Sequence, residues 1–430
     1  MAVVYGEQKR LRIPQNFLQA AKRRKNNRTM KKIKQQKWSR LRHRFFVKLA
    51  TPVVWGMSKF CYHAKVETFP QAKERPYLVL MNHQTAFDGL LVNYAFRKRK
   101  MYTVTTEDIH SNGWISSLLR FAVRPIPINK RGNDLQCVRN CIRIAREGAS
   151  VAIAPEGNST FSGYNCYIKP SIVKMIRLLQ LPVALFRIEG GFGVRPRWCD
   201  KIRRGKMRAY VSQVIERGTY ERMTDDELYN AIVTGLHQDD NLAGLTIKSR
   251  HKAEYLERAL YTCPHCGITE WQSKGNFLTC TRCGKKVEYT SSLTFRGQGE
   301  DAPYPTVGDW YRAQEEYVLH RTFAAEEQFG EDSVSLFRVI PYRKKVLLHK
   351  KATLKLFGDR VEIVSDDETL TLPFDRLGMA ICGKNKLNLY FGEDSYQIRG
   401  GKRFCAVKYY HLCVRHRLGE KNGEFQFLGL

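Results

Sequence analysis

Residues Tyr77–Asp88, which read YLVLMNHQTAFD, carry the strongest indication of the fold. It begins with strand-forming residues, continues into a polar turn with His83, and reaches Asp88 five positions later. A helical pattern follows over residues 89–100. Residues five apart on an ideal helix point about 140° away from each other, so His83 should lie in the turn and Asp88 at the helix start if both serve one site. This arrangement puts reactive groups at the carboxyl end of a strand, where open α/β sheets bind ligands.

His83 can take up and return a proton near neutral pH. A carboxylate within reach fixes the tautomer of a histidine and stabilises the imidazolium, and Asp88 is suited to this task. Since neither Ser nor Cys adjoins His83, the pair more naturally activates a hydroxyl of the substrate. The alternative is a buried histidine at a strand end that is satisfied by a helix-capping aspartate, and the pair taken alone favours that alternative.

Three further blocks follow in order along the chain. They are Ile126–Arg131 (IPINKR), Pro155-Glu156-Gly157 after a strand, and the apolar run that begins with Leu181-Pro182-Val183. Together with Asn82-His83 and Asp88, these blocks resemble the lysophosphatidic acid acyltransferase family of glycerolipid acyltransferases. The resemblance covers about residues 45–220, and the order and spacing of the blocks are more specific than any single one.

The resemblance implies roles for particular residues. His83 and Asp88 would be catalytic, and the substrate-binding residues would be Asn82, Arg131, Glu156, Gly157 and Asn158. Within that set, Arg131 would hold the phosphate of the acceptor and the Glu156 carboxylate would contact acceptor hydroxyls. One position departs from the family pattern, because Ser159 stands where an Arg is common. Either Arg187 or Arg195 replaces that cation, or the acceptor lacks the usual phosphate.

Residues 45–240 alternate between strand and helix patterns, which predicts an α/β domain with a mainly parallel sheet. The expected strands span residues 77–81, 102–105, 124–128, 151–154, 183–188 and 207–211. The expected helices span residues 89–99, 111–121, 134–147, 172–179 and 224–238. Thr224 and the acids after it form a typical helix start.

The formal net charge is +32, which suits a polyanionic partner such as an anionic membrane surface. A basic arm spans residues 1–44, and residues 45–62 are mainly apolar and aromatic with an expected break at Pro52. This stretch is either an interfacial membrane segment or a hairpin packed in the core. No apolar run approaches the roughly 18 residues of a spanning helix.

Cys263, Cys266, Cys280 and Cys283 form two C-x-x-C pairs within a predicted zinc ribbon at residues 255–292. Four thiolates at this spacing suit a closed tetrahedral zinc site, so we expect a structural zinc ion with no catalytic role. The other eight cysteines are scattered, which predicts free thiols in a reducing compartment.

The remainder of the chain is divided into a connecting helical segment (293–330) and a β domain (331–430). Seven short strands are expected at residues 346–349, 352–356, 360–364, 369–373, 379–382, 386–391 and 395–398, before a helix at 404–417. This pattern resembles a pleckstrin-homology or GRAM-like domain, whose ligand is left open.

The resemblance implies an O-acyltransferase that transfers an acyl group from acyl-CoA or acyl carrier protein to a lysophospholipid, most simply 1-acylglycerol-3-phosphate. Backbone N–H groups around His83 are expected to hold the oxyanion. The expected location is cytoplasmic, peripheral on the inner face of the cell membrane. The rival interpretations are a basic zinc-ribbon protein that binds nucleic acid, which the position of the basic arm disfavours, and an inactive lipid-binding scaffold.

Overall fold

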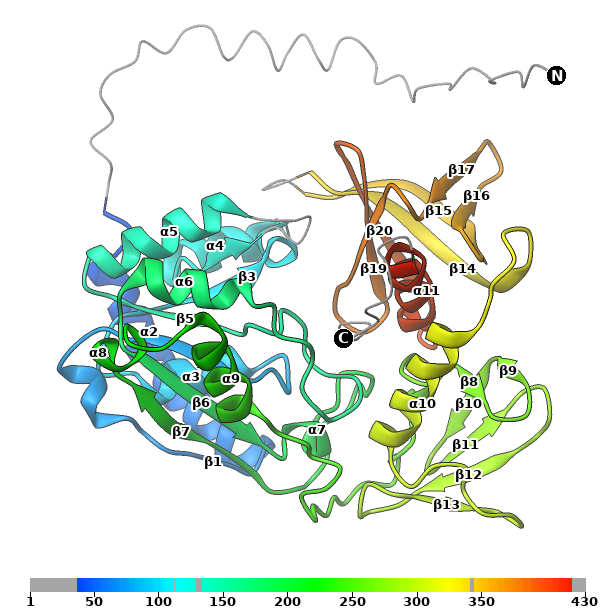
Figure 1. Cartoon of the computed structure of the whole chain (residues 1–430), viewed down its shortest axis with the longest axis horizontal. Coiled ribbons are helices and arrows are strands. Elements are labelled where there is room, and N and C mark those ends of the chain that lie inside the picture. The colour runs from blue at the N-terminus through cyan, green and yellow to red at the C-terminus, as the bar shows by residue number, and fades with distance from the viewer. Residues whose placement is uncertain (1–36, 112, 129–133, 341–343, 420–430) are drawn as a thin grey trace, which may run out of the picture. The chain divides into compact units, whose positions relative to one another are not determined.

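The computed structural model describes residues 37–111, 113–128, 134–340 and 344–419, and the described residues from Ser39 onward belong to one unit (Figure 1). The first half of this unit is built on a seven-stranded sheet with the order β1-β7-β6-β2-β5-β3-β4. Neighbouring strands run parallel except for β6 and β7, so the predicted mainly parallel sheet is confirmed. The strands are β1 (Ala64–Val66), β2 (Leu78–Met81), β3 (Met101–Thr106), β4 (Ile126–Ile128), β5 (Ser150–Ile153), β6 (Val183–Glu189) and β7 (Met207–Ile215).

Strand β2 lies at the centre of this sheet and is buried along its whole length, as expected for a parallel strand that is covered on both faces. Val79 and Met81 pack in one apolar cluster with Leu91 of helix α3 (Asp88–Ala95). Because side chains alternate along a strand, Leu78 and Leu80 point to the opposite face, and both are fully buried there.

The remaining main helices of this half are α4 (Trp114–Ala122), α5 (Leu135–Arg146), α6 (Ser171–Leu179) and α9 (Asp225–Leu236). Helix α5 is capped by the Asp134 side chain, which accepts from the Cys137 N–H at 2.9 Å. Helix α9 begins with the expected capping box, in which Thr224 and Glu227 satisfy each other's backbone N–H groups. These local signals explain why the helix starts agree closely with the sequence pattern.

The break expected at Pro52 is wrong. Helix α2 runs from Leu41 to Gly56 through Pro52 and continues into the π-helical turn Met57–Cys61. Proline removes the hydrogen bond to the carbonyl four residues earlier, here that of Lys48. Since Lys48 and Pro52 are both exposed, solvent can hydrate that carbonyl and the helix continues.

The cysteine-rich segment forms two small antiparallel sheets. The first pairs β8 (Thr262–Cys263) with β9 (Gly267–Ile268), and the second has the order β10-β11-β12-β13. The strands of the second sheet are β10 (Trp271–Lys274), β11 (Phe277–Cys280), β12 (Lys286–Tyr289) and β13 (Phe295–Gly297). Helix α10 (Val307–His320) follows and buries Trp310 and Tyr311 completely, so it belongs to the core as well as connecting the sheets.

The C-terminal part is an antiparallel seven-stranded sheet with the order β17-β16-β15-β14-β20-β19-β18. Its strands are β14 (Gln328–Arg338), β15 (Val346–Phe357), β16 (Arg360–Val364), β17 (Thr369–Pro373), β18 (Leu377–Ile381), β19 (Lys386–Phe391) and β20 (Asp394–Gly400). Helix α11 (Ala406–Gly419) packs against β18.

The sequence-based strand list for this sheet is wrong at two places. The two strands expected at residues 346–356 are one long strand, β15, and the strand β14 was not predicted. The first half of β14 reads QFGED, which contains a single apolar side chain and so lacks the alternation of apolar and polar residues that predicts a strand. None of these five residues is fully buried. Its pairing is supplied by the distant partners β15 and β20, which a local pattern does not contain.

A single apolar cluster connects the three parts of the unit. It includes Phe161 and Phe192 from the first half, Trp271 of β10, and Leu354 of β15. A cluster of this kind is the mark of one folding core. Perturbing the cysteine-rich segment should therefore affect residues well beyond it.

Candidate active site

His83 and Asp88 lie in contact at the carboxyl end of β2. The strand ends at Met81, the chain turns, and α3 begins at Asp88. The His83 Nδ1 atom lies 2.8 Å from Asp88 Oδ2. The Asp88 side chain is completely buried, whereas 25% of the His83 side chain is exposed. One edge of the imidazole is therefore held by the carboxylate while another part remains open to a substrate.

The neighbours of Asp88 determine which nitrogen of His83 carries the proton. Asp88 Oδ2 also accepts from the backbone N–H groups of Gln84 and Thr85, at 2.7 and 2.9 Å. Asp88 Oδ1 accepts from the Thr85 hydroxyl at 2.7 Å. An ionised carboxylate only accepts hydrogen bonds, so the Nδ1 atom of His83 must carry the proton and donate it to Asp88. The lone pair of the neutral imidazole then lies on Nε2.

Glu156 lies behind the His83 turn. Its Oε1 accepts from the His83 N–H at 3.0 Å and from Asn165 Nδ2 at 2.7 Å, and its Oε2 accepts from the Cys166 N–H at 2.8 Å. Burial raises the pKa of Glu156 to about 7, although these hydrogen bonds and nearby His83 act in the opposite direction. The expected contact with acceptor hydroxyls does not fit this geometry, because both oxygens are occupied. Glu156 instead positions the backbone of His83.

Asn82 is also placed differently from the expectation. It is fully buried, and its side chain forms two hydrogen bonds of 2.8 Å with the backbone N–H and carbonyl of Ile188 on β6. The amide therefore extends the pairing of β2 and β6 by one residue. A substrate contact by this side chain does not fit the geometry, because both ends of the amide are engaged.

The turn after Glu156 is open at its tip. Gly157 has a φ of +71°, and a Cβ atom added there would meet no atom within 4 Å. Asn158 and Ser159 follow in half-buried positions, and Arg197 donates to the Ser159 carbonyl at 2.8 Å. Glycine is suited to this left-handed backbone. The predicted phosphate ligand Arg131 lies outside the described residues.

The two cations proposed to compensate for Ser159 have different surroundings. Arg187 lies 3.6 Å from Glu189 and donates to Gln238 at 2.9 Å. The Arg195 guanidinium lies 4.6 Å from the centre of the Phe87 ring, beside the start of α3, and donates to the Tyr62 hydroxyl at 2.6 Å. Among the described residues, Arg195 has no ion pair with an acid, so it is the better placed to meet an anionic group.

Asp240 holds the glycine-rich loop at residues 190–193, which packs on the His83 turn. It accepts from the N–H groups of Gly190 and Phe192, at 2.9 and 3.0 Å. The adjacent Gly191 packs so closely on the His83 turn that an added Cβ would lie 2.7 Å from the Cβ of Gln84. The glycine-rich run at residues 190–193 is the feature of the sequence that could have indicated this close packing.

Three backbone N–H groups of the turn are already engaged and are not free to form the expected oxyanion site. The N–H of His83 donates to Glu156, and those of Gln84 and Thr85 donate to Asp88. These three donors are committed to holding the turn in shape. An oxyanion donor must therefore be a group other than these three.

Comparison with protein-family models identifies the segment that carries this geometry. Residues 62–188, which contain the whole of the His83–Asp88 and Glu156 arrangement, match the family model described as Acyltransferase. This segment is an acyltransferase domain. The chain is also similar to a crystal structure of the 1-acyl-sn-glycerophosphate (LPA) acyltransferase PlsC from Thermotoga maritima, with 15% sequence identity and a TM-score of 0.34, over 45% of this chain and 76% of that chain. A search of curated proteins found no match.

The four cysteines beyond the acyltransferase domain converge on one point. All four sulfur atoms lie within 4.8 Å of one another, with Sγ distances of 3.7 Å for Cys263–Cys283 and 4.0 Å for Cys266–Cys280. Tetrahedral zinc with bonds of about 2.3 Å requires sulfur atoms about 3.8 Å apart. The donor set and its spacing therefore fit a zinc ion that would be held by four thiolates, with no ligand position left for a substrate.

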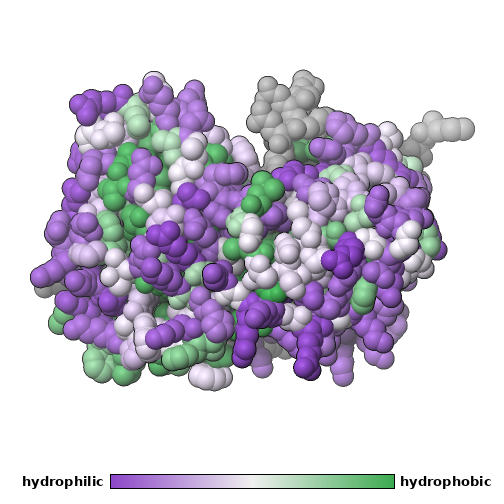
Figure 2. All heavy atoms as spheres, turned by 90° about the horizontal axis from the view of Figure 1, so that it is seen from below, coloured by the Kyte–Doolittle hydropathy of each residue, from purple (hydrophilic) through white to green (hydrophobic). Residues whose placement is uncertain are grey.

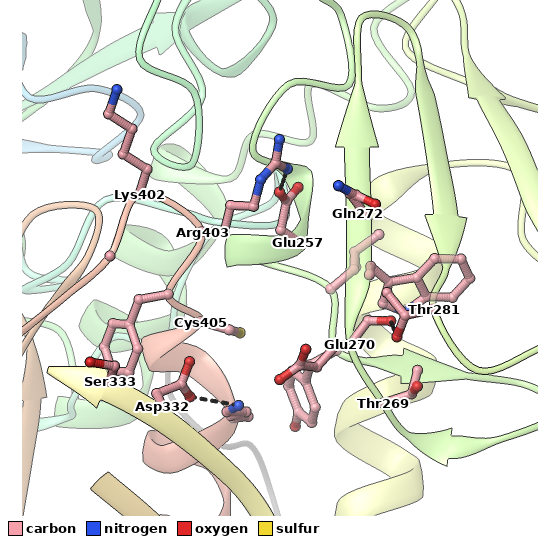
Figure 3. A pocket seen from close by; sticks show the side chains of 16 residues that line it. Glu257, Thr269, Glu270, Gln272, Thr281, Asp332, Ser333, Lys402, Arg403 and Cys405 are labelled. Atoms are coloured by element: carbon pink, nitrogen blue, oxygen red, sulfur yellow. Dashed lines mark hydrogen bonds and ion pairs between the residues drawn. The ribbon is translucent and has the colours of Figure 1, made fainter. Parts of the chain in front are cut away.

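A cavity of about 630 Å³ lies apart from the acyltransferase site (Figure 3). It is bordered by β10, β14 and the start of α11, and none of its lining residues belongs to the His83 or Glu156 turns. Two ion pairs stand in its wall, between Asp332 and Lys408 at 2.7 Å and between Glu257 and Arg403. The size of this cavity does not identify it as the reaction site, because the histidine–carboxylate pair is elsewhere.

Proposed function

We propose that the protein is an O-acyltransferase that moves a fatty acyl group from a thioester, acyl-CoA or acyl carrier protein, to a lysophospholipid at a membrane surface. The observation that carries this proposal is the 2.8 Å contact between His83 Nδ1 and the buried Asp88 carboxylate, within a segment of the acyltransferase family. The proposed acceptor is 1-acylglycerol-3-phosphate and the product is then phosphatidic acid.

The proposed reaction begins at Nε2 of His83. This nitrogen removes the proton from the acceptor hydroxyl as the oxygen attacks the thioester carbonyl, and the imidazolium that forms is stabilised by Asp88. The tetrahedral intermediate collapses with breakage of the carbon–sulfur bond. The proton on His83 then passes to the thiolate, which leaves as a thiol. General-base catalysis of this kind contributes about 10²–10⁴ in rate.

A phosphate on the acceptor is supported by the position of Arg195. Its guanidinium stacks on Phe87, the residue before Asp88, and no described acid pairs with it. An Arg presents several N–H donors in a planar fork that suits phosphate oxygens. Arg195 is therefore proposed to fill the role left vacant by Ser159.

Action at a membrane surface is supported by an apolar surface formed by two helices. Leu41, Phe45, Leu49 and Val53 repeat every four residues on α2, and each is more than 60% exposed. On α4, large exposed side chains are again grouped close together, and the two helices touch through Phe46 and Phe121, whose ring centres lie 5.8 Å apart. The exposed α4 side chains are Trp114, Ile115, Leu118 and Phe121.

Helices that expose an apolar face beside basic side chains can lie in the membrane interface. Figure 2 shows one face of the molecule, which is mostly hydrophilic and carries hydrophobic residues only in a few groups. Among the described residues, no helix has both the length and the apolar character required to cross a bilayer. The location that we propose is cytoplasmic, peripheral on the inner face of the cell membrane, and the net charge of +32 supports it because that face is anionic.

The test is acyl transfer from labelled acyl-CoA and acyl carrier protein to a panel of lysophospholipids on anionic vesicles. His83→Ala should abolish product formation, whereas the matched control His251→Ala, at an exposed site remote in sequence, should retain it. For the membrane contact, Phe45→Ser should reduce vesicle binding and Leu242→Ser should not, although Leu242 is 77% exposed. Equal activity of wild type and His83→Ala would overturn the proposed reaction.

A further inference from the structure

A second cavity, of about 420 Å³, lies beside helix α2 and is lined almost entirely by cations. Its lining residues are Arg44, Lys48, Thr51, Lys73, Arg97 and Lys98. Five of these six side chains carry a positive charge and none carries a negative one. Among the described residues, none of the five cations forms an ion pair with an acid. A hollow with this composition is a basic groove, and we use that name for it below.

The two walls of the basic groove come from parts of the chain that are distant in sequence. Arg44, Lys48 and Thr51 are spaced four and three residues apart, so they lie along one face of α2. Lys73 ends the short 3₁₀ helix Pro70–Lys73, and Arg97 and Lys98 follow the end of α3. The groove is therefore assembled only when α2 packs on α3, as the structure shows.

The wall opposite α2 is held in place by hydrogen bonds. Arg99 donates to the Lys73 carbonyl at 3.0 Å and to the Gly148 carbonyl at 3.1 Å, which ties the two loops together. Arg97 donates to the Tyr94 carbonyl at 3.2 Å and stacks over the Tyr94 ring at 4.7 Å. The half-buried Arg97 guanidinium is thereby fixed before any ligand arrives. Pre-ordered donors lose less entropy on binding than free surface lysines do.

Five unpaired like charges around one hollow repel each other, and an anion relieves this repulsion. The anion should carry more than one negative charge, because a single charge would leave most of the cations uncompensated. A phosphate monoester carries about −1.5 to −2 at pH 7 and has three acceptor oxygens. Phosphate oxygens are also the groups that Arg and Lys side chains bind best.

The apolar face of α2 indicates where that phosphate comes from. Leu41, Phe45 and Leu49 each lie three residues before or one residue after a cation of the groove, so the apolar stripe and the basic groove adjoin on one helix. If the stripe lies in the interface as proposed, the groove opens at the depth of the lipid headgroups.

We propose that the basic groove binds the phosphate monoester headgroup of a membrane lipid. The bound lipid would orient the acyltransferase domain on the membrane. This inference rests on the proposed membrane-surface function, but it does not depend on which acceptor is acylated. General attraction of a basic protein to any anionic surface would not distinguish phosphate monoesters from diesters, whereas a groove with five converging cations would.

The experiment measures binding of the full-length protein to phosphatidylcholine vesicles that contain either phosphatidic acid or phosphatidylglycerol, at matched surface charge. Wild type should prefer phosphatidic acid. Lys48→Ala/Arg97→Ala should lose about 25-fold in affinity for the phosphatidic acid vesicles, or about fivefold for each cation. Lys65→Ala/Lys174→Ala removes the same charge at exposed positions outside the groove and should lose no more than about threefold.

The outcomes separate the groove from the proposed function. An equal loss of affinity in both double variants, or equal binding of wild type to both lipids, would refute the proposed phosphate site. Neither result would contradict the proposed membrane-surface function. Absence of binding to every vesicle would refute that function. In that event, calorimetry with water-soluble dihexanoyl phosphatidic acid tests the groove independently of membranes. Binding by wild type that is lost only in Lys48→Ala/Arg97→Ala would support the proposed site. Absence of binding by wild type would refute it. Competition by inorganic phosphate as strong as that by the lipid would reassign the site to a free anion.

Discussion

Replacing Asp88 by Asn is expected to slow acyl transfer about 10³-fold while leaving the His83 turn folded. The Asn oxygen can still accept from the N–H groups of Gln84 and Thr85, which now donate to Asp88 Oδ2. The Thr85 hydroxyl, which donates to Asp88 Oδ1, can rotate and accept from the new amide. The substitution therefore removes the negative charge and keeps most of the local hydrogen bonds.

The magnitude follows from the contact between the two side chains. In the transition state His83 becomes positively charged, and its Nδ1 lies 2.8 Å from Asp88 Oδ2. With the delocalised charge centres about 4 Å apart and an effective dielectric constant near 20, the attraction amounts to about 4 kcal/mol. Losing this term in the transition state corresponds to about 10³ in rate, since each 1.36 kcal/mol is about tenfold.

The assay is steady-state acyl transfer to the acceptor found in the panel. The loss should appear in kcat with KM nearly unchanged, because Asp88 is fully buried and does not touch the acceptor. Asp226→Asn, at an exposed position in the first turn of α9, is the matched control for the loss of one carboxylate. A decrease of less than about tenfold in Asp88→Asn, with the thermal transition intact, would refute the role assigned to Asp88.

Three further perturbations test the structure around the site. Burial raises the pKa of Glu156 from 4.5 to about 7, so the folded state binds this proton more tightly and the free energy of unfolding should fall by about 3 kcal/mol as pH rises from 4.5 to 7. Chemical denaturation across that range should show a shallower pH dependence for Glu156→Gln, and an unchanged slope would contradict the assignment. If the four cysteines hold the proposed zinc ion, treatment with a chelator, or Cys283→Ser, should lower the thermal transition because the cysteine-rich segment shares an apolar cluster with both neighbouring parts, whereas Cys61→Ser, outside the cysteine cluster, should not. Arg197 donates to three backbone carbonyls from two distant segments, so Arg197→Lys should cost about 1–3 kcal/mol in denaturant unfolding, compared with little change for the exposed Arg204→Lys.

Features that depend on near neighbours along the chain could be predicted from the sequence alone. The central apolar strand, the polar turn and the helix start place His83 and Asp88 together, since only five residues separate them and the turn leaves little freedom. The parallel sheet follows from continuous apolar runs, and the four-cysteine cluster follows from the two C-x-x-C pairs. Each of these signals is complete within a short stretch of chain.

Roles that depend on partners distant in sequence became visible only in the folded structure. Glu156 is bound to the His83 N–H from 73 positions away, and Asn82 is bound to Ile188 from 106 positions away. The family resemblance implied that both contact substrate, and the local sequence shows no other partner for either side chain. Strand β14 and the basic groove were also missed because each depends on segments that are distant in sequence. Hydrogen bonds and charges at long sequence separation are set by packing, and a local pattern contains no record of which segments will meet.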